Sequence, residues 1–210
     1  MYQRALEGKE KALRPDHTWT LNTINNLGNL YLYQGRLKEA ETMYQRALEG
    51  YEKAIGPDHT WTLNTVNNLG LLYSNQGRLK EAETMYQQAL KGCEKALGPD
   101  HTWTLNTINN LGSLYLNQGR LEEAETMYQQ ALKGCEKALG PDHTSTLDTV
   151  NNLGDLYKIQ GRLKEAETMY QRALSGYSAA LGSSHPKALL VIKKIASLQP
   201  AQGSSLLGVR

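Results

Sequence analysis

The sequence lacks an excess of charge of either sign, since Lys and Arg together number 23 and Asp and Glu number 21. The charges alternate along the chain without forming a basic block, so nothing indicates a nucleic-acid-binding surface. The chain also lacks any apolar run of about 18 residues or more and any signal-peptide pattern after Met1. These absences predict a cytoplasmic protein with neither a nucleic-acid nor a membrane partner.

Cysteine is scarce, and the two residues present, Cys93 and Cys135, stand 42 positions apart. Neither belongs to a CxxC pair or a Cys/His cluster, which disfavours a metal or redox role. Equivalent positions in stacked helices lie about 8–10 Å apart or more, whereas disulfide-bonded Cα atoms lie about 4.4–6.8 Å apart. We therefore expect two reduced thiols packed between helices.

Motifs for catalysis are also missing. The chain contains no Gly-rich phosphate loop, no HExxH and no GxSxG. Glu39, Glu41, Glu81 and Glu83 are typical of a solvated helix face. Histidines recur once per 42 residues, which spreads them along an axis and disfavours a shared metal; they are His17, His59, His101, His143 and His185. We predict helix-start roles for them, no enzyme activity and no cofactor.

What the sequence does contain is a repeat. The tripeptide Met-Tyr-Gln begins at Met1 and returns 42 positions later each time, at Met43, Met85, Met127 and Met169. A fixed period of this length is typical of stacked units that contact mainly their neighbours. Within each unit, apolar residues three and four apart predict two amphipathic helices, as over 59–76 and 79–97. Asp58, Thr60 and Asp100 are the candidate N-caps.

The period divides the chain into segments. They are the second helix of a truncated repeat (1–14), four complete repeats (15–56, 57–98, 99–140 and 141–182), a C-terminal capping helix (183–199) and a tail expected to be disordered (200–210). We expect the capping helix to have a polar outer face. We also expect the truncated repeat to expose Tyr2, Ala5, Leu6 and Ala12.

The repeat resembles the tetratricopeptide family, whose pattern is present as Leu69-Gly70, Tyr73, Ala82, Tyr86 and Ala89, followed by Pro99. It departs from that family in having Val66 where Trp is usual, and a period of 42 residues instead of about 34. The long period and the GPDHT junction are similar to kinesin light chain repeats and to the C-terminal arrays of fungal nucleotide-oligomerisation-type receptors. The resemblance implies an all-α fold, a right-handed superhelical solenoid of antiparallel helix pairs.

The resemblance also implies a concave groove lined by the first helix of each repeat. The repeats differ most on this helix at Asn29, Leu71, Ser113 and Asp155, which we expect to set side-chain preference together with Leu32, Ser74, Leu116 and Lys158. Asparagine amides suit the gripping of an extended peptide's N–H and C=O groups. The candidates are Asn22, Asn64 and Asn106, and, at the family's matching positions, Asn26, Asn68, Asn110 and Asn152.

Trp19, Trp61 and Trp103 lie one turn before the first asparagine of their repeats and are predicted on the rim of the groove. Two structural alternatives remain open at this point. The amides could simply bond neighbouring helices, and each tryptophan could pack between helix ends.

We predict a non-catalytic protein–protein interaction module that binds an extended peptide segment in its groove, as part of a larger scaffold or sensor protein. The alternative is a structural array that self-associates, by end-to-end stacking or helix exchange through the truncated N-terminal repeat. The similarity to fungal receptors suggests a third hypothesis, the sensor end of a larger switch.

Overall fold

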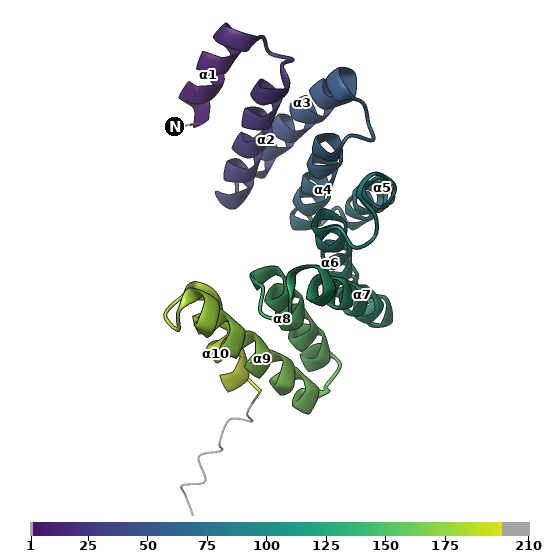
Figure 1. The fold of residues 1–210 in the computed structure, drawn as a ribbon, viewed down its shortest axis with the longest axis vertical. Helices are drawn as coiled ribbons and strands as arrows, with labels where there is room; N and C mark the ends of the chain where they lie inside the picture. The colour runs from purple at the N-terminus through teal and green to yellow at the C-terminus, as the bar shows by residue number, and fades with distance from the viewer. Residues whose placement is uncertain (1, 199–210) are drawn as a thin grey trace, which may run out of the picture. The chain divides into compact units, whose positions relative to one another are not determined.

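The computed structural model describes residues 2–198, and the chain forms two compact units, Met1–Gln118 and Gly119–Arg210. All regular structure within the described residues is α-helical (Figure 1). The predicted tail at 200–210 and the last residue of the predicted capping segment lie outside these residues. The predicted all-α fold, with helices packed in adjacent pairs, is confirmed.

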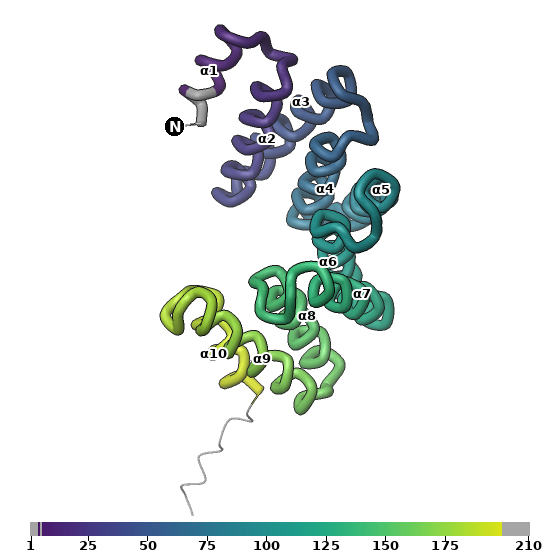
Figure 2. Tube along the Cα trace, in the orientation of Figure 1, coloured from purple at the N-terminus to yellow at the C-terminus, as the bar shows by residue number. Residues whose placement is uncertain are grey.

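The first unit contains α1 (Tyr2–Leu13), α2 (Thr18–Tyr33), α3 (Leu37–Ile55), α4 (Thr60–Asn75), α5 (Leu79–Leu97) and α6 (Thr102–Asn117). The second unit contains α7 (Leu121–Leu139), α8 (Thr144–Ile159), α9 (Leu163–Leu181) and α10 (Pro186–Ala196). Within each unit, the chain reverses between successive helices in short turns (Figure 2). Gly77 and Gly98 stand in two of these turns with φ of 74° and 91°, a region that side chains with a Cβ rarely adopt.

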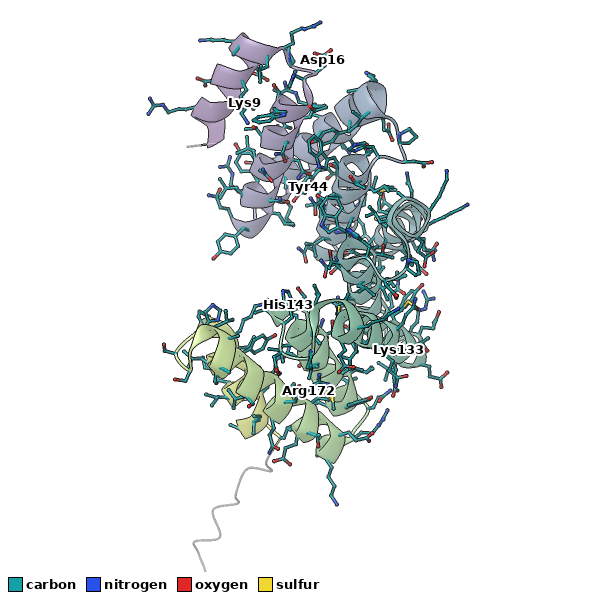
Figure 3. The ribbon with its side chains drawn as sticks, viewed as in Figure 1. Lys9, Asp16, Tyr44, Lys133, His143 and Arg172 are labelled. Carbon is teal, nitrogen blue, oxygen red and sulfur yellow. The ribbon has the colours of Figure 1, made fainter. Side chains whose placement is uncertain are left out.

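Each first helix begins directly after a histidine. The backbone of His59 is extended, and its Nδ1 accepts a hydrogen bond from the N–H of Trp61 at 3.1 Å. His143, before α8, caps in the same way (Figure 3). The predicted N-caps Asp58, Thr60 and Asp100 were wrong, because the imidazole is long enough to reach the free N–H groups of the first turn.

Within a pair, large side chains of one helix lie over glycines of the other. Buried tyrosines of the second helices lie against glycines of the first, in the pairs Tyr44–Gly28, Tyr86–Gly70 and Tyr170–Gly154. Tyr44, a residue of α3, is labelled in Figure 3. In the opposite direction, leucines of the first helices lie over glycines of the second, in the pairs Leu21–Gly50, Leu63–Gly92 and Leu147–Gly176.

Helix α1 packs on α2 through the core cluster of Leu21, Ile24, Ala47 and Tyr51. Leu6 is partly buried against this cluster, so its predicted exposure was wrong, whereas Ala12 is exposed. The side chains of Tyr2 and Ala5 lie outside the described set.

Replacing Gly70 with Ala should lower the free energy of unfolding by about 1–2 kcal/mol, because overpacking costs more than the gain in helix propensity. The added Cβ would lie 2.8 Å from carbons of the buried Tyr86 ring. Gly8→Ala is the matched control, since no heavy atom of the described residues lies within 4 Å of a Cβ there. Urea unfolding measures both variants, and an equal loss of stability in the two would contradict the packing argument.

Candidate binding surface

Two hollows lie along α2, α4 and α6 of the first unit. The larger, of about 160 Å³, is lined by Asn22, Asn25, Asn26, Asn29, Tyr51, Trp61, Asn64 and Trp103. The smaller, of about 110 Å³, is lined by Leu63, Asn64, Asn67, Cys93, Trp103, Asn106 and Thr107. Asn64 and Trp103 line both, so the hollows adjoin. We call the two hollows together the α2–α4–α6 strip.

Half of the predicted peptide-binding residues line this strip, namely Asn22, Asn26, Asn29, Asn64, Asn106, Trp61 and Trp103. Five others in the first unit line neither hollow, namely Asn68, Asn110, Leu71, Ser113 and Trp19. Asn152 and Asp155 belong to the second unit. Trp19 is 62% exposed and Trp61 38% exposed.

Asn68 and Asn110 bond to the preceding first helix. The Nδ2 of Asn68 donates to Oδ1 of Asn25 at 3.2 Å, and the Nδ2 of Asn110 donates to Oδ1 of Asn67 at 3.2 Å. In the second unit Lys194 donates to Asn151 at 2.9 Å with the same separation of 43 positions. The bond therefore persists where Lys replaces Asn, which favours a role in joining helices for this position.

The asparagines one turn earlier have uncommitted N–H groups. Among the described residues, the Nδ2 groups of Asn22, Asn64 and Asn106 donate to no acceptor of the chain. The Oδ1 of Asn64 accepts from Asn68 at 3.3 Å, which orients the amide. Three oriented or exposed N–H donors, one per repeat, therefore lie along the strip.

The most variable position of the first helix also contacts the paired helix. The hydroxyl of Tyr44 donates to Oδ1 of Asn29 at 2.7 Å, and that of Tyr170 donates to Oδ1 of Asp155 at 2.7 Å. Burial, together with Asp155, raises the pKa of Tyr170 well above its usual range. Leu71 stands at the same position and has no oxygen to accept from Tyr86.

Acidic residues particular to the fourth repeat hold α10. Lys187 contacts Asp148 at 2.6 Å, and Lys194 contacts Asp155 at 2.6 Å. The two carboxylates therefore have partners within the second unit. The predicted polar outer face of α10 was wrong, because Leu189, Leu190 and Ile192 are 46%, 52% and 45% exposed.

Two of the four glutamates predicted on a solvated face, Glu41 and Glu83, join repeats instead, whereas Glu39 and Glu81 are exposed as predicted. Glu41 accepts from Gln76 at 2.9 Å and from Arg78 at 2.7 Å, and Glu83 accepts from Gln118 at 3.3 Å. The pKa of Glu41 is lowered overall. Burial alone would raise this pKa, but the hydrogen bonds from Gln76 and Arg78 together outweigh the effect of burial. The guanidinium of Arg78 also lies 4.0 Å from the ring centre of Tyr73.

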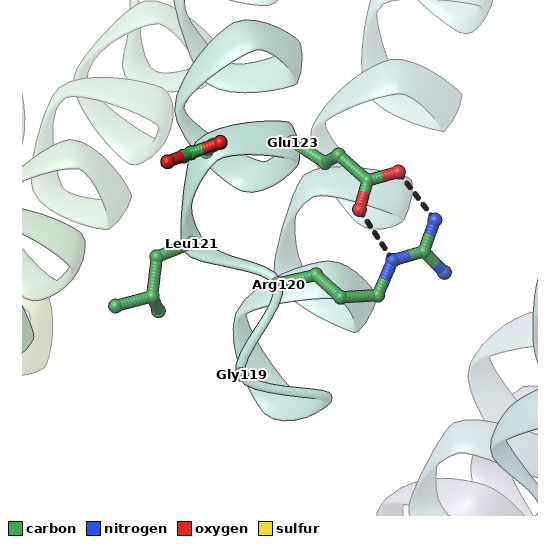
Figure 4. A pocket seen from close by; sticks show the side chains of 5 residues that line it. Gly119, Arg120, Leu121 and Glu123 are labelled. Carbon is green, nitrogen blue, oxygen red and sulfur yellow. Dashed lines mark hydrogen bonds and ion pairs between the residues drawn. The ribbon is translucent and has the colours of Figure 1, made fainter.

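A third hollow, of about 400 Å³, lies at the turn before α7 and is lined by residues 119–123 (Figure 4). Arg120 donates to Glu123 across it at 2.6 Å. The same pair recurs as Arg36–Glu39, Arg78–Glu81 and Arg162–Glu165. This hollow is a feature of the repeat's turn, and two of its charged groups, Arg120 and Glu123, are paired with each other.

The two cysteines are free and buried. Burial raises the pKa of both thiols, which keeps them protonated. Over residues 2–198, no group of three or more His, Cys, Asp or Glu side chains is arranged to hold a metal ion. In the same range, every helix is too short or too polar to cross a membrane.

Comparison with known proteins supports the resemblance inferred from the repeat. The family profile described as tetratricopeptide repeat matches residues 1–53, 23–95, 61–137 and 104–179. No curated protein matches the chain.

Two solved structures share the fold. BtubC (BKLC) from P. vanneervenii is 22% identical, with a TM-score of 0.70 over 100% of this chain and 96% of that one. A putative kinesin light chain of Podosopora anserina with nearly identical TPR-like repeats is 23% identical, with a TM-score of 0.70 over 87% of this chain and 86% of that one. A variant of the latter gives a TM-score of 0.71 over the same shares. The predicted similarity to kinesin light chain repeats is thus confirmed.

Replacing Leu71 with Asn should raise the free energy of unfolding by about 1 kcal/mol, because the new Oδ1 can accept from Tyr86 as Asn29 does from Tyr44. Leu71→Ala is the control, since it removes the same exposed leucine without adding an acceptor. Both variants are compared with wild type by urea unfolding. Equal stability of the Asn and Ala variants would show that Tyr86 gains nothing from an acceptor.

Proposed function

Because the chain belongs to the tetratricopeptide repeat family, whose members generally mediate protein–protein interactions, we propose that its α2–α4–α6 strip holds an extended segment of a partner protein. The module is non-catalytic and works within a larger cytoplasmic scaffold or sensor protein. The observation that carries this proposal is the row of N–H donors on Asn22, Asn64 and Asn106, one from each repeat of the first unit.

The spacing of these donors suits a peptide backbone. Packed helices lie about 8–10 Å apart, and an extended chain rises about 3.3 Å per residue. One asparagine would therefore meet about every third carbonyl oxygen of the partner. Such contacts are independent of the partner's side chains, whose contacts come from Trp61 and Trp103 in the walls of the hollows.

The proposal assigns different roles to two sets of asparagines. Asn22, Asn64 and Asn106 contact the partner, whereas Asn68 and Asn110 position the helices. Asn26 has an intermediate status, because it lines the larger hollow but donates to Asn22 at 3.4 Å.

A pull-down from a random library of extended peptides tests these roles. The wild-type chain should enrich peptides, and the variant with Asn22, Asn64 and Asn106 all changed to Ala should not. The free energy of unfolding of this variant should differ from that of the wild type by less than about 1 kcal/mol. Changing Asn68 and Asn110 to Ala is the matched control, and should lower that free energy by about 1–3 kcal/mol while folded protein still enriches peptides. Enrichment that survives in the triple variant would overturn the proposal.

Self-association is a second candidate, favoured by the faces of α1 and α10. Leu189 of α10 corresponds to Leu21, Leu63 and Leu147, each of which lies over a glycine, yet Leu189 is 46% exposed. Gly8 of α1 corresponds to Gly50, Gly92 and Gly176, yet a Cβ added to Gly8 would have no heavy atom of the described residues within 4 Å. The α10 of one copy could pair with the α1 of another as the two helices of one repeat do, a head-to-tail contact.

Light scattering of the 210-residue chain tests this candidate. The average mass should rise with concentration up to the high micromolar range, and Leu189→Glu should keep it monomeric by placing a charge in the contact. Leu163→Glu, at an equally exposed leucine of α9, is the control. A wild-type chain that stays monomeric throughout would count decisively against self-association.

A further inference from the structure

One position of the second helix is occupied by Lys9, Tyr51, Cys93, Cys135 and Tyr177 in turn. Long side chains stand there in three helices. Lys9 of α1 donates to Thr23 at 2.8 Å (Figure 3), and the ring of Tyr51 of α3 lies 6.1 Å from that of Trp61. Tyr177 of α9 donates its hydroxyl to Asp148 at 2.5 Å. At this position a long side chain thus reaches toward the first helices beside it.

Cys93 of α5 stands at the same position and is too short to reach as far. The hollow beside it is lined by Leu63 and Thr107, which are themselves only 2% and 3% exposed. Their counterparts Leu21 and Thr65 do not line the hollow beside Tyr51, and Tyr51 belongs to the same buried cluster as Leu21. With cysteine at this position, the hollow extends down to buried residues. With tyrosine at the same position one repeat earlier, it does not.

We propose that the Cys93 hollow receives a tyrosine side chain of the bound partner segment, an assignment that rests on the proposed function. The ring would contact Leu63 and Trp103. Their counterparts are Leu21, which shares a buried cluster with Tyr51, and Trp61, whose ring centre lies 6.1 Å from that of Tyr51. The hydroxyl would meet Asn64, which corresponds to the Asp148 that accepts from Tyr177.

The chemistry of the lining favours an aromatic side chain over a charged one. Among the residues that the structure describes, no acidic residue lines the hollow, so a lysine side chain would be buried there without a counter-ion. Burial raises the pKa of the Cys93 thiol, so it presents a protonated, weakly polar wall. Cys93 therefore acts through its small size, which leaves space for the ring. The amides of Asn64 and Asn106 lie beside the partner's backbone.

The experiment uses p-cresol, the tyrosine side chain as a free molecule, and follows the indole N–H signals of the three tryptophans by NMR. In the wild-type chain, p-cresol should shift the Trp103 signal saturably at millimolar concentration, with Trp103→Phe providing the assignment. Cys93→Tyr should weaken binding at least about tenfold, because the chain's own ring fills the hollow. Cys93→Ala, which leaves the hollow open, should bind as the wild type does.

A second variant guards against misfolding of the first. Tyr51→Cys should open an equivalent hollow and make the Trp61 signal respond to p-cresol, which a disrupted fold would not produce. Equal binding by wild type and folded Cys93→Tyr would overturn the proposal. A Trp103 response to n-butylamine without one to p-cresol would overturn it as well, in favour of a lysine side chain.

The peptide library separates this assignment from the proposed function. If wild type enriches peptides that share no aromatic residue, the strip binds a backbone and the tyrosine assignment fails. If p-cresol binds at Cys93 while no peptide is enriched, the hollow is an aromatic site and the extended-segment function fails.

Discussion

The fit of large side chains over glycines within each helix pair is the interaction on which the rest of the structure depends. Tyr86 can lie against α4 only because Gly70 has no Cβ, and Leu63 can lie against α5 only because Gly92 has none. These contacts bring the two helices close together and fix their rotation about their own axes. The rotation in turn decides which residues of the first helix stay available to a ligand, and Asn64 and Trp61 are among them.

Polar bonds between repeats complete this arrangement. On one side of the repeat, Asn68 donates to Asn25, and on another, Arg78 and Gln76 donate to Glu41. Each such bond is worth only about 0.5–1.5 kcal/mol net, but an unmade one would leave a partly buried polar group without a partner. Bonds of the same kinds join Asn110 to Asn67 and Arg162 to Glu125. They make the contact between neighbouring repeats directional, which apolar packing alone does not.

Near identity of the repeats makes the exceptions informative. Asp148 and Asp155 replace neutral residues only in the repeat whose neighbour is α10, where Lys187 and Lys194 face them. Cys93 replaces a tyrosine where a hollow opens beside Trp103. In a chain with so little variation, the two aspartates fit one common repeat to the terminal helix α10, and Cys93 leaves the space in which we propose that a partner's side chain binds.

The sequence by itself determined the period, the helix pairs and the family, because these follow from local spacing: Leu79–Leu97 was predicted to the residue. The sequence also identified most of the polar residues of the strip, since asparagines that recur every 42 residues among apolar residues can be recognised from the sequence. Only the tertiary structure decided which of them contact other helices. Asn64 and Asn68 are one turn apart and chemically identical, yet only Asn68 reaches the preceding repeat. The same holds for Glu41 and Asp155, whose partners are 37 and 39 positions away, because the distance between side chains of different helices depends on packing and not on spacing along the chain.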